Sequence, residues 1–227
     1  MIQKIERKPL FIIFGLIMAA AILGYLSFPG KIIIPVQYGN LYKLPLIDGC
    51  YQILKSAYID KPGCYTVQED LFLEKSNDYL AWIKSDNVSI NLNGKTVMGP
   101  GENSIQSGVY IEGGNDIAIS NGIIDGFMFG IRGAADAQGN PLKAVSVANV
   151  TISNSSLIGI QLAADKVRIL DSKIVRLEHK TSKHNYVLDI QLTSPECYYS
   201  GVVVYEKMGS NVIDPLIILP TDCKVKN

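Results

Sequence analysis

A ten-residue pattern that occurs four times is the feature that most constrains the fold of this chain. Each copy aligns with the others without a gap and holds an aliphatic residue at its first, third and eighth positions. The fifth position always holds a residue that favours tight turns. The copies are INLNGKTVMG from Ile90, IAISNGIIDG from Ile117, VTISNSSLIG from Val150 and VRILDSKIVR from Val167. Four such matches in one chain indicate a structural repeat.

The pattern predicts two short strands joined at a corner. Positions one and three point to the same side of a strand because side chains alternate, and position eight points inward again on the next strand. Because one copy cannot bury its aliphatic side alone, we expect the copies to stack. Corner asparagines are then expected to hydrogen-bond to the copies above and below. The predicted corner residues are Gly94, Asn121, Asn154 and Asp171.

A third strand is expected beside each copy, which would give a parallel β-helix of about 4–6 turns. The copies start 27, 33 and 17 residues apart, and the longest interval contains a predicted loop at Ala134–Lys143. A β-sandwich is the alternative, but its strands have no reason to share corner residues in register. The segments that predict the third strand are Gly108–Gly113, Phe129–Gly133, Ile158–Ala163 and, more loosely, Ala81–Ser85.

Several of these segments together resemble a known family. GCYTVQEDLFL, DNVSINLNGKTVMG, GVYIEGGNDIAISNGIIDGF and GIR are similar to sequences of the pectate-lyase-like superfamily, the right-handed parallel β-helix proteins of exported bacterial type. The resemblance covers roughly Gly63 to Arg176. It implies a right-handed coil that often binds or processes polysaccharide. Because its motifs encode corners and core, they specify the fold more than the function.

The N-terminal segment is predicted to be a membrane anchor. An uncharged apolar run, Leu10–Phe28, is long enough to cross a hydrocarbon core of about 30 Å as a helix. Lys4, Arg7 and Lys8 precede this run. They predict a single-pass protein with a cytoplasmic N-terminus and a periplasmic or extracellular body. Cleavage of a signal peptide after Ala21 is the alternative, but it would leave an apolar new terminus.

The sequence accordingly predicts five parts. The C-terminal part is expected to contain a hairpin around Met208–Asn211, which separates two apolar runs. Caps are expected at both ends of the coil because open sheet ends invite aggregation. The parts are a cytoplasmic tail at 1–9, the anchor at 10–28, a linker and N-terminal cap at 29–64, the parallel β-helix at 65–178 and a C-terminal cap at 179–227.

Four cysteines fit an exported body. Cys50 and Cys64 follow the predicted anchor, and Cys197 and Cys223 lie near the C-terminus. Four cysteines allow three pairings, of which the local one would link Cys50 to Cys64 and Cys197 to Cys223. Disulfides are favoured over free thiols in an oxidising compartment. No Cys-x-x-Cys motif occurs, so no zinc site is expected.

A column of aromatic and polar side chains is the candidate binding surface. In the related fold a glycan would lie here, with aromatic rings against sugar rings and polar groups as hydrogen-bond partners. The alternative is an ordinary solvated sheet with a surface pair of Glu112 and Arg132. As outward residues, they are expected to contribute little to the core. The column comprises Trp82, Lys84, Tyr110, Glu112, Arg132 and Gln161.

No catalytic set is predicted. Glycoside hydrolysis needs two carboxyl groups about 5–10 Å apart, and the Asp-Asp pair and Gly-His-Gly of the family's polygalacturonases do not occur here. A lyase reaction would need calcium and a basic residue, for which Arg132 with Asp125 nearby is the candidate. The acids lie singly at corners, so no metal site and no cofactor are expected. Calcium is implied only by the lyase alternative.

The sequence therefore predicts a membrane-anchored surface module that binds polysaccharide without catalysis. Lys and Arg together number 21, as do Asp and Glu, so the charge gives no reason to expect nucleic acid as a partner. The expected partners are the membrane, through residues 10–28, and a polysaccharide; protein partners are left open. A polysaccharide lyase and a scaffold in a cell-envelope complex are the two alternatives.

Overall fold

The computed structural model describes residues 46–176, 188–194, 196–206, 217–218 and 223–226. These residues form strands and one 3-10 turn at Gly101–Asn103, and no α-helix occurs among them. The predicted anchor at 10–28 lies outside the described residues. No helix within the described ranges is long and apolar enough to cross a membrane.

Parallel strands account for almost all of the described body. Every pairing between described strands is parallel except that of β1 with β2. The strands are β1 Leu46–Ile47, β2 Cys50–Ile53, β3 Ala57–Ile59, β4 Gly63–Val67, β5 Leu71–Phe72, β6 Ala81–Ile83, β7 Val88–Asn91, β8 Thr96–Met98, β9 Ser107–Glu112, β10 Ile117–Asp125, β11 Phe129–Ala134, β12 Leu142–Ser153, β13 Ile158–Leu170, β14 Lys173–Arg176, β15 Leu188–Thr193, β16 Glu196–Ser200, β17 Val203–Glu206, β18 Ile217–Ile218 and β19 Lys224–Lys226.

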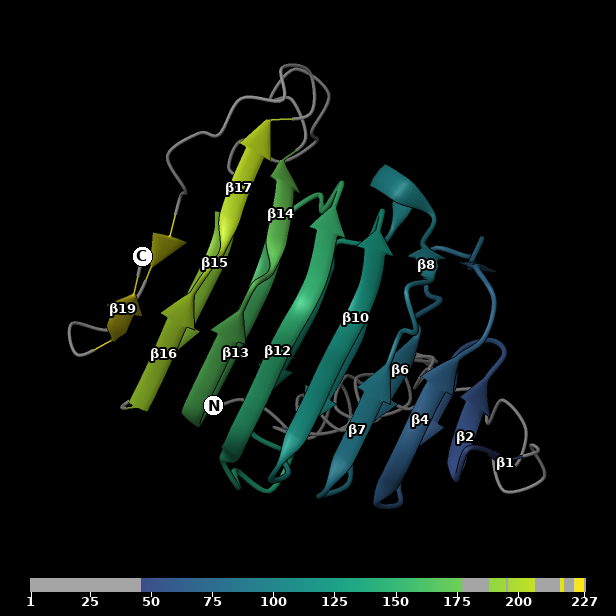
Figure 1. Cartoon of the computed structure of the whole chain (residues 1–227), viewed down its shortest axis with the longest axis horizontal. Coiled ribbons are helices and arrows are strands. Elements are labelled where there is room, and N and C mark those ends of the chain that lie inside the picture. The colour runs from purple at the N-terminus through teal and green to yellow at the C-terminus, as the bar shows by residue number, and fades with distance from the viewer. Residues whose placement is uncertain (1–45, 177–187, 195, 207–216, 219–222, 227) are drawn as a thin grey trace, which may run out of the picture. The chain divides into compact units, whose positions relative to one another are not determined.

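The chain passes repeatedly through two parallel sheets, and we call each passage a coil. Sheet A contains, in order, β2, β4, β7, β10, β12, β13, β16 and β19, which follow one another across the front of Figure 1. The shorter strands β5, β8, β14 and β17 also belong to sheet A. Sheet B contains β3, β6, β9, β11, β13, β15 and β18. Strand β13 is long enough to belong to both sheets: its first part pairs in sheet B and its second part in sheet A. The expectation of an all-β protein with parallel strands is therefore confirmed.

The core is built from ladders of aliphatic side chains that stack from coil to coil. In sheet A, Ile90, Ile119, Val147 and Ile169 pair in succession, and each is 0% exposed. Their chain neighbours on the same strands face outward, as the alternation of a strand requires. Burial of each such side chain contributes about 2 kcal/mol, so the ladders are the main favourable term in the stability of the body.

The predicted copies from Ile117 and Val167 share one register. Val145, on the strand between them, pairs with both. The predicted start of the third copy at Val150 is wrong. Val150 pairs with Gly122, and the residue that pairs with Ile117 is Val145. Aliphatic alternation continues through this segment on both sides of the corner, so the alternation alone does not reveal where the repeat begins.

The copy from Ile90 is also displaced. Ile90 pairs with Ile119, the third position of its copy, and Val88 takes the place opposite Ile117. The later strand nevertheless returns to the predicted match, since Val97 pairs with Ile124. The corner after β7 contains more residues than the corresponding corner of β10, and this restores the register by β8. An alignment without gaps does not detect such an insertion.

The predicted corner residues all have left-handed backbone geometry, with φ of 73° at Gly94, 60° at Asn121, 53° at Asn154 and 45° at Asp171. A ladder of amides runs along one corner. The Nδ2 of Asn121 donates to Oδ1 of Asn91 at 3.2 Å, and the Nδ2 of Asn149 donates to Oδ1 of Asn121 at 3.1 Å. The coil-to-coil hydrogen bonds expected of the corner asparagines are therefore present at Asn121.

Asn154 lies at a different corner from Asn121. Its Nδ2 donates to Oδ1 of Asp125 on the preceding coil, and Oγ of Ser153 donates to the same oxygen at 2.5 Å. Within the described residues, Oδ1 of Asn154 and Oγ of Ser155 are buried without a hydrogen-bond partner. The side chain of Asn154 thus bonds to the preceding coil through its amide nitrogen, and its backbone N–H donates to the carbonyl oxygen of Val175 on the next coil at 3.3 Å.

The parallel pairing extends beyond the limits predicted for the β-helix. In the segment predicted as linker and N-terminal cap, 29–64, β2 pairs with β4 and β3 pairs with β6. In the segment predicted as C-terminal cap, 179–227, β15, β16 and β19 continue the two sheets. The predicted hairpin turn at Met208–Asn211 lies outside the described residues; β17 pairs with β14, and β18 pairs with β15 in the other sheet. These strands pair without carrying the ten-residue pattern, so the pattern missed them.

Two disulfides link neighbouring coils near the two ends of the described body. Cys50 on β2 is bonded to Cys64 on β4, and Cys197 on β16 is bonded to Cys223, which directly precedes β19. These are the local pairings, one of the three arrangements that four cysteines allow. Each closes a short loop between adjacent strands and so limits separation of the outer coils.

Asn154→Ala is expected to lower the free energy of unfolding by about 1–2 kcal/mol, because it removes the donor to Asp125 and places alanine at a left-handed position. Ser155→Ala is the matched control. Its hydroxyl is buried without a partner, so removing it should change the free energy by less than about 0.5 kcal/mol. Urea unfolding measures both variants, and equal losses would contradict a role of Asn154 in joining the coils.

Candidate functional site

The outward side of sheet B brings together four of the predicted binding residues in one row. Trp82 pairs with Tyr110, Tyr110 with Arg132, and Arg132 with Gln161. Each comes from a different coil, on β6, β9, β11 and β13 respectively. The flanking residues on these strands, such as Ala81 and Ile83, are fully buried. The row therefore exists because the inward positions fix the strands in register.

The row continues beyond Trp82 and beyond Gln161, through residues that sequence reasoning missed. Tyr58 pairs with Trp82, and Gln191 pairs with Gln161. Two short similarities could have revealed them. The segment AYI at Ala57–Ile59 resembles AWI on β6, and the tripeptide IQL occurs both around Gln161 and around Gln191.

Aromatic rings dominate one end of the row. The ring centroid of Trp82 lies 6.0 Å from that of Tyr58, 6.0 Å from that of Tyr79 and 5.6 Å from that of Tyr110, each in an edge-to-face arrangement. The indole Nε1 donates to Oε2 of Glu112 at 2.9 Å. Trp82 is thus held by contacts on several sides, although it lies on the outward side of sheet B and outside the buried core.

Glu112 and Lys84 form a polar group beside the indole. Nζ of Lys84 lies 3.0 Å from Oε1 of Glu112, whose side chain is 11% exposed. The hydrogen bond to Glu112 raises the pKa of Lys84, against the opposing effect of burial. The stabilisation from this pair is therefore complete below the ordinary lysine pKa and is lost as the pH rises through the raised value. The predicted surface pair of Glu112 with Arg132 is wrong, because Lys84 occupies the carboxylate.

Arg132 lies between the aromatic and the polar ends of the row. Its guanidinium carbon is 5.9 Å from the ring centroid of Tyr110 and 4.8 Å from that of Phe129. These distances are in the range of cation–π attraction. Arg132 is exposed, and no carboxylate among the described residues pairs with it. The positive charge is therefore available to a ligand.

A shallow hollow of about 190 Å³ lies at the polar end of the row. Nε2 of Gln161 donates to Oε1 of Gln191 at 2.7 Å, which aligns the two amides along the hollow. The small side chains of Ala134 and Ala163 leave space beside them. The hollow is lined by Arg132, Ala134, Gln161, Ala163, Gln191 and Thr193.

The acidic residues considered for a lyase reaction do not gather in the described part of the chain. Among the residues that the structure describes, no group of three or more His, Cys, Asp or Glu side chains is placed to hold a metal ion. The carboxylate of Asp125, the acid considered beside Arg132, accepts hydrogen bonds from Ser153 and Asn154 at a corner. Both histidines, His179 and His184, lie outside the described residues.

Comparisons with family models, with curated proteins and with solved structures found no match to this chain. The side chains of the site are therefore the basis for inferring its ligand. They offer one exposed cation, two aligned amides and a hydroxyl, next to a cluster of aromatic rings.

Trp82→Ala is expected to lower the free energy of unfolding by about 2–4 kcal/mol, because it removes the contacts with the tyrosine rings and one donor to Glu112. Trp82→Phe keeps an aromatic ring but lacks the indole N–H, so a smaller loss of about 1 kcal/mol is expected. Chemical denaturation measures both. A loss below about 0.5 kcal/mol for the alanine variant would show that the ring contacts carry no stability.

Proposed function

We propose that this chain is a membrane-anchored, extracytoplasmic protein whose body is a right-handed parallel β-helix of the pectate-lyase-like type. The parallel coils, the left-handed corner residues and the corner amides support this assignment. The two disulfides support an oxidising compartment. The basic residues before the apolar run at 10–28 support the orientation.

We further propose that the outward row of sheet B binds polysaccharide, and that an acidic polysaccharide is preferred. The hollow beside Arg132 is the observation that carries this proposal. Paired glutamine amides offer both donors and acceptors, which is what sugar hydroxyl groups require. The guanidinium of Arg132, without a carboxylate partner among the described residues, adds a bidentate donor for a uronate carboxylate.

The size and direction of the row favour one sugar unit of a longer chain. The hollow, at about 190 Å³, is smaller than pockets that enclose a whole drug-sized ligand. A polymer lying along the row would contact successive coils, which are spaced by about 4.8 Å. Each coil would add one small contact, so affinity would depend on chain length.

Arg132→Ala is expected to weaken retention of the full-length chain on immobilised polygalacturonate by about tenfold, and to change retention on neutral dextran much less. Gln161→Ala should weaken both, because it removes an amide used by hydroxyl groups. Lys143→Ala is the matched control, since it removes an exposed cation of sheet A outside the hollow. Affinity electrophoresis measures all four proteins.

Equal retention of the Arg132 and Lys143 variants would contradict the proposed site. Incubation with polygalacturonate and calcium separates binding from catalysis, because a lyase releases an unsaturated product that absorbs ultraviolet light. Formation of that product by the wild type, and its loss in the Arg132 variant, would replace the binding function by a lyase.

The proposed anchor predicts that the full-length chain sediments with membranes and resists extraction by alkaline carbonate, because a spanning helix is held by its apolar length. Mass spectrometry of the mature protein is expected to find Met1 or Ile2 at the N-terminus. A mature protein that begins near Ile22 would instead indicate a cleaved signal peptide.

A further inference from the structure

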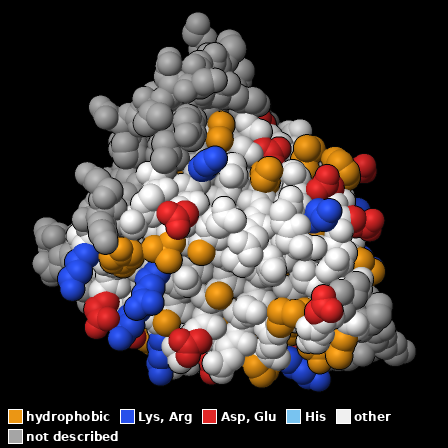
Figure 2. Space-filling view, viewed as in Figure 1, with side chains coloured by type: hydrophobic (Ala, Val, Ile, Leu, Met, Phe, Trp, Pro, Cys, Tyr) orange, Lys and Arg blue, Asp and Glu red, His pale blue; other side chains and the backbone are white. Residues whose placement is uncertain are grey.

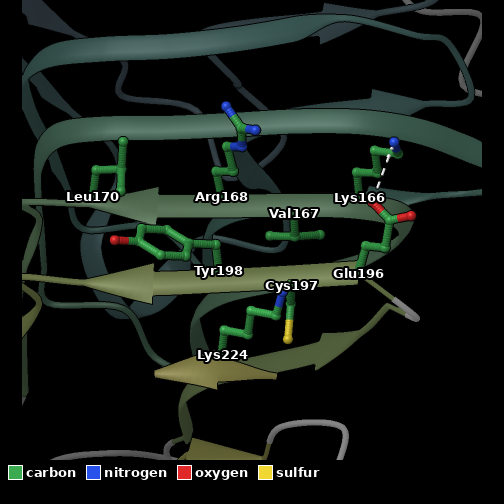
Figure 3. Close-up of a pocket in the computed structure, with 8 residues that line it drawn as sticks. All are labelled: Lys166, Val167, Arg168, Leu170, Glu196, Cys197, Tyr198 and Lys224. Carbon is green, nitrogen blue, oxygen red and sulfur yellow. Dashed lines mark ion pairs between the residues drawn. The ribbon is translucent and has the colours of Figure 1, made fainter. Parts of the chain in front are cut away.

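A second surface, on the outward side of sheet A, gathers basic side chains on three adjacent strands. Figure 2 shows these side chains at the end of the sheet where β13, β16 and β19 lie. A hollow of about 750 Å³ opens there. Figure 3 shows its lining, to which β13 contributes Lys166, Arg168 and Leu170, β16 contributes Glu196 and Tyr198, and β19 contributes Lys224.

The charge in this hollow is unbalanced. Among the described residues that line it, Glu196 is the one acidic residue, and its Oε2 lies 3.1 Å from Nζ of Lys166. This pair is highly exposed, with side chains 68% and 63% exposed. Arg168 and Lys224 have no carboxylate partner among the described residues. Two cations therefore face the hollow without a neutralising group from the described part of the chain.

The register of the strands places three residues that carry hydrogen-bond donors in a line. Arg168 pairs with Tyr198, and Tyr198 pairs with Lys224. Successive strands are about 4.8 Å apart, so the backbones of these three residues follow one another at that spacing. In Figure 3 the side chain of Lys224 extends toward β16 and ends beside Cys197, and the guanidinium of Arg168 extends away from β16.

The neighbouring strand leaves the approach to this line open. Ser146 of β12 pairs with Arg168, and the adjacent outward positions on that strand are Ala144 and Ala148. These short, uncharged side chains neither cover the guanidinium nor compete for it. Leu170 adds an apolar edge to the same hollow.

We propose that this hollow binds a phosphate or sulfate ester. A tetrahedral oxyanion presents oxygens in several directions, so it suits a site whose cations, Arg168 and Lys224, come from different strands. The two oxygens of a carboxylate, in contrast, are satisfied by the guanidinium fork alone. The volume falls in the range of roughly 300–1,000 Å³ that encloses a whole small ligand, so the organic part of the ester fits beside Leu170.

This site is separate from the proposed polysaccharide site, because it lies on the other sheet and uses different residues. Two sources share the chemistry of its ligand: a phosphorylated or sulfated sugar, and the headgroup of a phospholipid. In both, a tetrahedral group carries one or two negative charges, which the two cations without a described carboxylate partner would match. The experiment below distinguishes these sources.

Isothermal titration of the full-length chain with glucose 6-phosphate tests the proposal, with malonate as a dianion whose charges lie on two planar carboxylates. Glucose 6-phosphate is expected to bind about tenfold more tightly than malonate. Arg168→Ala and Lys224→Ala should each weaken its binding by about tenfold, and Tyr198→Phe by a few-fold. Lys173→Ala is the matched control, because it removes an exposed cation of sheet A outside the hollow.

Sedimentation with vesicles that contain phosphatidic acid forms the second arm. Binding of the vesicles, lost in the Arg168 variant and retained in the Lys173 variant, would assign the site to a lipid headgroup. Binding of glucose 6-phosphate with no binding of the vesicles would assign it to a soluble ester. Either result supports recognition of an oxyanion ester.

A measurement on the wild-type protein tests the proposal even if the variants do not fold. Bound glucose 6-phosphate is expected to protect Arg168 from phenylglyoxal, as read by peptide mass spectrometry, while malonate at the same concentration protects it less. Equal binding of the two compounds, equal affinity of the Arg168 and Lys173 variants, or no heat of binding and no protection at millimolar ester would each overturn the proposal.

Discussion

Parallel backbone pairing in register, from one coil to the next, determines where the side chains of the described body lie. Because each residue sits beside its counterpart on the neighbouring coil, an inward position remains inward and an outward position remains outward along the stack. The buried ladder of Ile90, Ile119, Val147 and Ile169 is the result on one side. The row of Trp82, Tyr110 and Arg132 is the result on the outward side of the other sheet.

The corners make this register possible. Left-handed residues such as Asn121 and Asp171 turn the chain within one residue, so the strands before and after them keep their phase. The amides of Asn91, Asn121 and Asn149 bond to one another along the stack and satisfy polar groups that the turn exposes. The corner after β7 takes more residues, and there the ten-residue pattern and the observed pairing diverge.

The sequence contained enough information for the strand type, the corner residues and the outward row, because aliphatic alternation and turn residues are local signals. It did not contain the phase of the copy from Val150, since alternation continues on both sides of that corner. Nor did it reveal that Glu112 pairs with Lys84 in place of Arg132. The partner of Glu112 depends on the conformations of the extended lysine and arginine side chains, and the backbone register does not determine those conformations. Strands such as β3 and β16 were missed because they do not carry the ten-residue pattern, although their inward residues Ile59 and Cys197 are buried.

The same register rule explains how one body can carry two unlike surfaces. Inward positions are constrained by packing, so they vary little in character from coil to coil, whereas an outward side chain can change without disturbing the ladder behind it. The outward positions of sheet B hold aromatic rings and amides, and those of sheet A hold Arg168 and Lys224. Trp82 marks the limit of that freedom, because its contacts with Tyr58, Tyr79 and Glu112 make an outward residue part of the structure. Ligand binding is therefore expected where the outward side chains no longer contact one another and their charges or amides are exposed, as beside Arg132.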